Sequence, residues 1–202
     1  ILVVNRTILD SLISISYDLS KICVSHISNF DSLMLGISFN DSISTWDVSN
    51  AISMSSMFQD ASLFNQYVGN WDVGNVTNMS SMFEGATSYS QSMYNWNASS
   101  ATNMSSMFKN ASSFNGDTRY WNVQNVTDIS SMFEGASSFN QELRNWNTSN
   151  VTDMSSMFEG ATSYNQFMIN WNASSATNMS SMFKNAVSFY GFGIDYWNLS
   201  NV

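Results

Sequence analysis

Apolar residues recur at fixed places in successive 25-residue stretches of this 202-residue chain. The tryptophans mark the period most clearly, with five successive spacings of 25 residues and a last spacing of 26. They are Trp46, Trp71, Trp96, Trp121, Trp146, Trp171 and Trp197. A fixed period of this length is typical of repeat architectures, in which each unit buries its apolar face against its neighbours.

Each unit carries a pattern that predicts a short helix. Apolar residues five, eight, eleven and fifteen places after Trp follow the three- and four-residue steps of one helix face. A Ser or Thr before this run, such as Thr77 or Thr152, is a suitable N-cap. Gly, Asn or Asp stands fourteen places after Trp, where a left-handed residue ends a helix. The predicted helix has about two turns and needs its neighbours for stability.

The segment before each Trp alternates like a short strand. In "FNQELRNWN", residues 139–147, we expect Phe139, Leu143 and Trp146 to point inward, with turns near Asn145 and Asn147. The predicted fold is therefore an α/β repeat solenoid with one short strand and one short helix per unit. Parallel strands would stack at about 4.8 Å per coil. The core then contains the seven tryptophans and a ladder of Phe58, Phe83, Phe108, Phe133, Phe158 and Phe183.

The repeat pattern also divides the chain. Residues 1–38 fit the period poorly and are interpreted as an N-terminal cap or degenerate repeat. Residues 39–202 form the solenoid of about six to seven repeats. A longer period of 75 residues joins two copies of "NWNASSATNMSSMFKNA", at 95–111 and 170–186, which indicates growth by copying three units. No second cap is recognisable, so the array is expected to be truncated at its C-terminal end.

Composition narrows the class of partner. Charged residues make up only 10 % of the chain and the formal net charge is −9, which disfavours nucleic acid and anionic lipid as partners. No stretch is long and apolar enough for direct membrane insertion. Cys23 is the only cysteine, so neither an intrachain disulfide nor a cysteine metal cluster is expected.

The unit "FNQELRNWNTSNVTDMSSMFEGA", residues 139–161, closely resembles the 25-residue repeat of BspA-like leucine-rich-repeat surface proteins. The resemblance covers about residues 39–202 and does not extend to residues 1–38. It implies a leucine-rich-repeat-like, right-handed coil, exposure at the cell surface or secretion, and a role in adhesion or recognition. The resemblance supplies no catalytic residues to transfer.

Candidate chemistry is sparse. His26, the only histidine, has only nearby Cys23 as a nucleophile, so we expect two ordinary cap residues rather than a catalytic dyad. The Met columns suit core packing better than a copper site. No cofactor is expected; weak calcium binding by oxygen atoms of the Asp/Asn columns is the alternative, but carboxylates are few and most of these residues are Asn.

Two groups of surface residues are candidates for contact or modification. Tyrosines outside the regular columns are the expected contact residues: Tyr67, Tyr94, Tyr120, Tyr190 and Tyr196. Asn-x-Ser/Thr triplets are glycan acceptors in a eukaryotic secreted protein, although an Asn/Ser/Thr-rich repeat also generates them incidentally. The candidate acceptors are Asn75, Asn78, Asn97, Asn103, Asn110, Asn125, Asn150 and Asn178.

These observations favour a non-enzymatic, extracellular or cell-surface protein for adhesion or recognition of proteins or glycans. Repeated units present the same surface many times, so weak contacts add through multivalency. The alternative is a structural subunit of a fibre, surface layer or matrix that self-associates through the ends of the solenoid.

Overall fold

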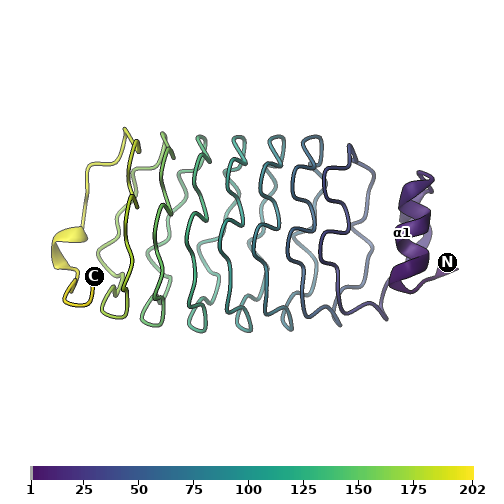
Figure 1. Ribbon diagram of the computed structural model, residues 1–202, viewed down its shortest axis with the longest axis horizontal. Helices are drawn as coiled ribbons and strands as arrows, with labels where there is room; N and C mark the ends of the chain where they lie inside the picture. Colours follow the sequence, from purple (N-terminus) through teal and green to yellow (C-terminus); the bar gives the residue numbers. More distant parts are fainter. Residues whose placement is uncertain (1) are drawn as a thin grey trace.

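The computed structural model describes residues 2–202 and shows 25-residue coils stacked side by side, with a helix at one end (Figure 1). The described elements are β1 (Leu2–Val3), α1 (Arg6–Ser14), the 3-10 helix η1 (Leu19–Lys21), β2 (Ile22–Cys23) and the 3-10 helix η2 (Ile194–Tyr196). Strands β1 and β2 pair in parallel. All other described residues form turns and extended segments of the coils.

Backbone hydrogen bonds hold each coil to the next in register. The N–H of Met54 donates to the carbonyl of Asn78 at 3.0 Å, and the N–H of Ser56 donates to Ser80 at 2.8 Å. One residue per coil forms a parallel bridge with its counterparts on either side, in a row of Asn29, Ser53, Asn78, Asn103, Asp128, Asp153 and Asn178. Because every coil repeats the same bonds, the 25-residue period becomes a ladder along the stack.

The prediction of a helix in each unit is wrong. Among residues 2–202, helical residues are confined to α1, η1 and η2. Residues 54–61 instead form overlapping turns, in which the N–H of Met57 bonds to Met54 and that of Ala61 to Phe58. Every second N–H group from Met54 to Asp60 donates to a carbonyl of the next coil, which an α-helix would prevent by using these groups internally.

Two positions in every turn segment have a left-handed backbone. The first is a serine with φ of 51–59°, at Ser56, Ser81, Ser106, Ser131, Ser156 and Ser181. The second is the column predicted to tolerate this conformation, with φ of 58–68° at Asp60, Gly85, Asn110, Gly135, Gly160 and Asn185. That prediction is confirmed for the backbone conformation, although these residues complete a turn and not a helix.

The predicted strand at 139–147 is also wrong, because these residues form no ladder with a neighbouring coil. The bridged residue of each coil lies instead one place before the position occupied by Met54 or Met79, as Asp128 lies before Ile129. The inward alternation nevertheless holds, since Phe139, Leu143 and Trp146 are all buried. Side-chain direction thus follows the apolar pattern without strand pairing.

Aromatic columns form the core of the stack. The first six tryptophans are at most 4 % exposed, and Trp197 in the last coil is partly buried. Each indole N–H donates to a backbone carbonyl of the previous coil, as Trp121 does to Met93 at 3.0 Å. The phenylalanines stack between coils, with ring centroids of Phe108 and Phe133 5.7 Å apart. The indole bonds satisfy donors that would otherwise be buried without partners.

Residues 30–36 form part of the first coil, because every second N–H group there donates to a carbonyl of residues 53–59, and the residues before them cover that coil. Helix α1 begins after Asn5, whose side chain accepts from the N–H of Ile8 at 2.9 Å, an N-cap. Leu9 of α1 is fully buried in the core, and the Arg6 guanidinium donates to the carbonyl of Asn29 at 3.2 Å. The helix therefore closes one end of the stack.

A buried hydroxyl in the aromatic column gives a stability prediction. Tyr89 stands where other coils have Phe64 or Phe114, and its hydroxyl has no hydrogen-bond partner among residues 2–202. Burial also raises the pKa of Tyr89 well above its ordinary value. We expect Tyr89→Phe to raise the free energy of unfolding by about 1–3 kcal/mol, measured by urea denaturation. The half-exposed Tyr94→Phe is the control, and an equal effect there would contradict the explanation.

Candidate ligand-binding surface

Residues two and four places before Trp form one outward-facing row across five coils. We call this row the variable strip. It consists of Tyr67, Gly69, Ser92, Tyr94, Asp117, Arg119, Glu142, Arg144, Phe167 and Ile169. Apart from Gly69, these residues are exposed or half-buried. The residue between each pair is fully buried, as Met93 and Leu143 are, so the extended backbone turns the strip residues outward.

Comparison of the coils distinguishes the strip from other outward positions. The exposed position six places after Trp is Thr in five coils: Thr77, Thr102, Thr127, Thr152 and Thr177. The copied segments 95–111 and 170–186 are identical in sequence. The strip residues of the two copies nevertheless differ, in the pairs Tyr67 and Glu142, Gly69 and Arg144, Ser92 and Phe167, and Tyr94 and Ile169. Between residues 64–94 and 139–169, all four strip positions differ, whereas 21 of the other 27 positions are identical.

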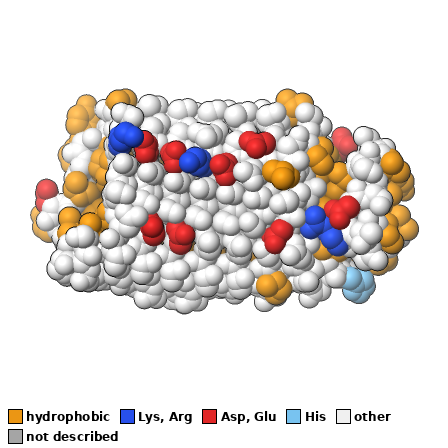
Figure 2. All heavy atoms as spheres, in the orientation of Figure 1, with side chains coloured by type: hydrophobic (Ala, Val, Ile, Leu, Met, Phe, Trp, Pro, Cys, Tyr) orange, Lys and Arg blue, Asp and Glu red, His pale blue; other side chains and the backbone are white. Residues whose placement is uncertain are grey.

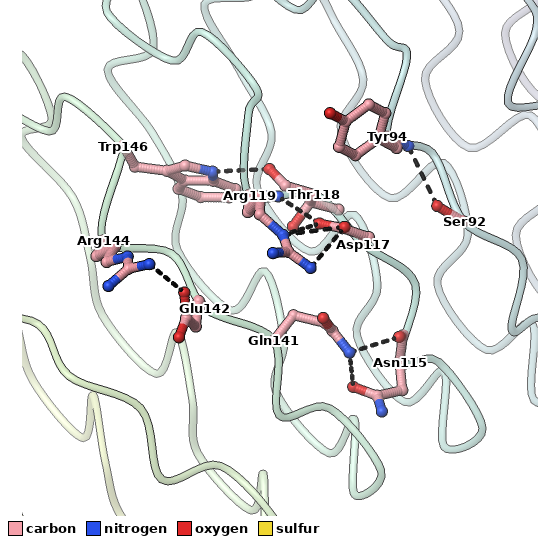
Figure 3. A network of polar contacts seen from close by, with 10 residues as sticks. All are labelled: Ser92, Tyr94, Asn115, Asp117, Thr118, Arg119, Gln141, Glu142, Arg144 and Trp146. Atoms are coloured by element: carbon pink, nitrogen blue, oxygen red, sulfur yellow. Dashed lines mark hydrogen bonds and ion pairs between the residues drawn. The ribbon is translucent and has the colours of Figure 1, made fainter.

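Polar side chains hold the backbone that precedes the strip. The amide N–H of Asn140 donates to Asn115 Oδ1 at 2.9 Å, and that of Asn165 donates to Asn140 Oδ1 at 2.9 Å. Gln141 Nε2 also donates to the carbonyl of Asn115 at 3.1 Å (Figure 3). These bonds join successive coils one or two residues before the strip. A surface fixed in this way loses little conformational entropy when it binds.

The centre of the strip carries two ion pairs on successive coils (Figure 3). Arg119 lies 3.0 Å from a carboxylate oxygen of Asp117, and Arg144 lies 3.2 Å from one of Glu142. Bonding to Asp117 raises the pKa of Arg119 above its ordinary value. Each pair joins residues of one coil and is neutral, so this region presents donors and acceptors without net charge.

Aromatic side chains flank the ion pairs. On one side, the rings of Tyr94 and Tyr120 meet edge to face with centroids 5.2 Å apart. On the other side, Phe167 stacks on Phe192 of the next coil at 5.0 Å. Phe167 also lines a shallow pocket with Glu142, Arg144, Gln166, Ile169 and Asn170. The strip thus offers two apolar ring surfaces separated by a polar centre.

The predicted contact tyrosines lie in different places. Tyr67 and Tyr94 belong to the strip, and Tyr120 packs against Tyr94. Tyr190 lies 6.2 Å from Phe192 between ring centroids, whereas Tyr196 ends η2 and makes no ring contact within residues 2–202. Sequence reasoning missed Arg119, Arg144, Phe167, Ile169 and Phe192. The sequence feature that could have indicated them is variation between the repeats at positions two and four places before Trp.

Comparison with known proteins identifies the family. Residues 6–121 and 112–202 both match the model of a family described as "Mycoplasma protein of unknown function, DUF285". The chain belongs to the DUF285 family. The two matches also agree with its repeated organisation. No curated protein and no solved structure matches the DUF285 chain.

The candidate glycan acceptors of this DUF285 chain fall into two environments. Asn78, Asn103 and Asn178 are half-buried at bridged positions of the ladder. The exposed acceptors are Asn75, Asn97, Asn110, Asn125 and Asn150. Three of these, Asn75, Asn125 and Asn150, donate from Nδ2 to a carbonyl of the preceding coil. Modification there would have to compete with that bond.

The Asp/Asn columns of the DUF285 chain bond locally. Asn97 Oδ1 accepts from the N–H of Ser99, and Asn103 Oδ1 accepts from that of Ser105, so these oxygens complete turns in their own coil. Within residues 2–202, no group of three or more His, Cys, Asp or Glu side chains is placed to hold a metal ion. Across the described chain, no helix is both long and apolar enough to span a membrane.

One face of the stack carries scattered charges, and one row of them contains both acidic and basic side chains (Figure 2). Lys109 lies 3.0 Å from Glu134 of the next coil, and Lys184 lies 2.6 Å from Glu159 of the preceding coil. The column thirteen places after Trp therefore pairs opposite charges between coils. Such partly exposed pairs contribute little to stability, about 0.2–1 kcal/mol each.

Proposed function

We propose that this DUF285 chain is a non-enzymatic recognition module of an extracellular or cell-surface protein, built on a BspA-like, leucine-rich-repeat-like solenoid. The closely similar repeat unit supports the resemblance, and the stacked coils agree with a solenoid. The observation that carries the function is the variable strip. Residues whose only role is packing between coils are expected to be similar in every coil. Residues that contact a partner are instead expected to differ, because each faces a different part of that partner.

The side chains of the strip support a role in contact rather than in catalysis. Its charged groups are paired with each other, as Asp117 with Arg119, and it has no nucleophile held by a neighbouring base. Its rings are largely exposed, with Phe167 61 % accessible. Exposed aromatic and Arg side chains on a rigid framework are the groups that most often dominate binding surfaces. Proteins or glycans at a cell surface are the expected partners.

The test is binding of labelled protein to a printed array of glycans and extracellular matrix proteins. The strip variant replaces five strip residues by Ser: Tyr67, Tyr94, Arg119, Arg144 and Phe167. We expect the wild type to bind members of the array and the strip variant to lose at least about tenfold in apparent affinity, because several anchoring side chains are removed.

A matched variant controls for general changes in the surface. It substitutes exposed residues away from the strip, Leu63→Ser, Thr87→Ala, Ser113→Ala and Thr162→Ala, and is expected to bind like the wild type. Equal binding by the strip variant, or no binding by the wild type to any printed glycan or protein, would argue against the proposal.

A structural subunit is the second candidate, and the far end of the stack favours it. In the last turn segment, the N–H groups of Met179, Ser181, Phe183 and Asn185 have no acceptor within residues 2–202. An apolar pocket beside them is lined by Met179, Met182, Phe183, Ile194, Trp197, Leu199 and Val202. Helix α1 covers the opposite end, so head-to-tail growth requires that α1 be displaced. Sedimentation velocity of the same preparations separates the candidates, since only a subunit forms larger species with rising concentration.

A further inference from the structure

Each of the two ring surfaces joins one residue of the variable strip to a neighbouring ring outside it, and both are open on their outer faces. Tyr94 and Tyr120 are 51 % and 57 % exposed, although they contact each other, and Arg119 lies 5.9 Å from the centre of the Tyr120 ring. Phe167 and Phe192 are 61 % and 46 % exposed although they stack. These contacts hold the rings in place while leaving apolar surface accessible to a ligand.

The polar centre between the rings favours a ligand without charge. The two arginines are the strip's only cations, and each is already paired with a carboxylate of its own coil. An anionic polymer would have to compete with Asp117 and Glu142 for these arginines. A neutral ligand meets no such competition, because the outward N–H groups and carboxylate lone pairs can bond to hydroxyl groups directly.

The shape of the strip favours a long, linear ligand. It crosses five consecutive coils, and beside Phe167 it has only a shallow pocket lined in part by Gln166 and Asn170. That pocket is open to solvent on one side, so it does not enclose a small molecule completely. A chain lying along the stack would instead contact both ring surfaces and the polar centre at once, so that weak contacts add.

We propose that the variable strip binds a neutral, linear polysaccharide lying along the stack. The apolar C–H faces of its sugars pack on the Tyr94–Tyr120 and Phe167–Phe192 rings, whose faces carry partial negative charge. Its hydroxyl groups donate to and accept from the two ion pairs. This assignment rests on the proposed recognition function and specifies the chemical class of its partner.

The test is affinity gel electrophoresis of the whole chain in gels that contain one polymer each. The neutral polymers are hydroxyethyl cellulose, laminarin and galactomannan, the anionic ones are alginate and heparin, and casein represents an unfolded protein. We expect at least one neutral polysaccharide to slow migration more than the anionic polymers or casein do. The double substitution Tyr94→Ala with Phe167→Ala should weaken this binding about tenfold or more, since each ring surface loses one member.

Matched variants make each outcome decisive. Tyr17→Ala removes a ring that is 39 % exposed and outside the strip, and it should leave retardation unchanged. If no neutral polysaccharide slows the wild type, or if the double variant migrates like the wild type in every gel, the inference is overturned. Stronger retardation by casein or by an anionic polymer, lost in the double variant, would overturn the polysaccharide assignment and leave the recognition function standing.

Discussion

Replacing Phe133 by Ala is expected to lower the free energy of unfolding by about 3–5 kcal/mol. Phe133 is fully buried, and its ring lies 3.8 Å from Phe139 and 5.7 Å from Phe108 and Phe158, centroid to centroid. Its removal leaves a cavity with coils on both sides. Because each coil is stabilised mainly by its neighbours, the loss weakens two interfaces at once.

Phe183 provides the matched control for this prediction. It occupies the same column in the last described coil, where it stacks on Phe158 at 5.5 Å and is only partly buried. We expect Phe183→Ala to cost less than half as much as Phe133→Ala, because only one interface is affected and less apolar area is lost. Urea unfolding followed by tryptophan fluorescence measures both variants. Equal losses would mean that the aromatic stack does not carry stability between coils.

Trp146→Ala is the second substitution with a large expected effect, again about 3–5 kcal/mol of unfolding free energy. The Trp146 ring stacks between Trp121 and Trp171, with centroids 6.3 Å and 6.2 Å away. Its indole N–H donates to the Thr118 carbonyl at 3.0 Å, which links two coils inside the core. Both the ring volume and this bond are lost in the Ala variant.

Trp146→Phe separates the two contributions, because it keeps most of the ring surface and removes the indole donor. We expect a loss of about 1–3 kcal/mol, since the Thr118 carbonyl still accepts from the N–H of Trp121 at 3.1 Å. Trp197→Phe, at the partly buried end of the column, should cost less. If Trp146→Phe were as damaging as Trp146→Ala, the hydrogen bond and not ring packing would dominate.

Only some residues of the candidate site could be predicted from their irregular positions in the repeats. Tyr67 and Tyr94 were found because they broke the regular columns, and both lie on the variable strip. Arg119 and Phe167 also depart from the regular columns, but the prediction of contact residues was confined to tyrosines. Comparing every position across the repeats would have found all of them. Their arrangement into two ring surfaces around paired charges required the structure.

The sequence by itself determined the period, the buried columns and the left-handed positions. Apolar spacing reports which side chains leave water, and Gly, Asn and Asp report where the backbone accepts positive φ. Only the tertiary structure decided that residues 54–61 form turns and not a helix. The three- and four-residue steps of Met54, Met57 and Ala61 fit both conformations, because both bury the same side chains. The choice depends on the N–H groups, whose acceptors lie 24 residues away on the next coil, where no local pattern records them.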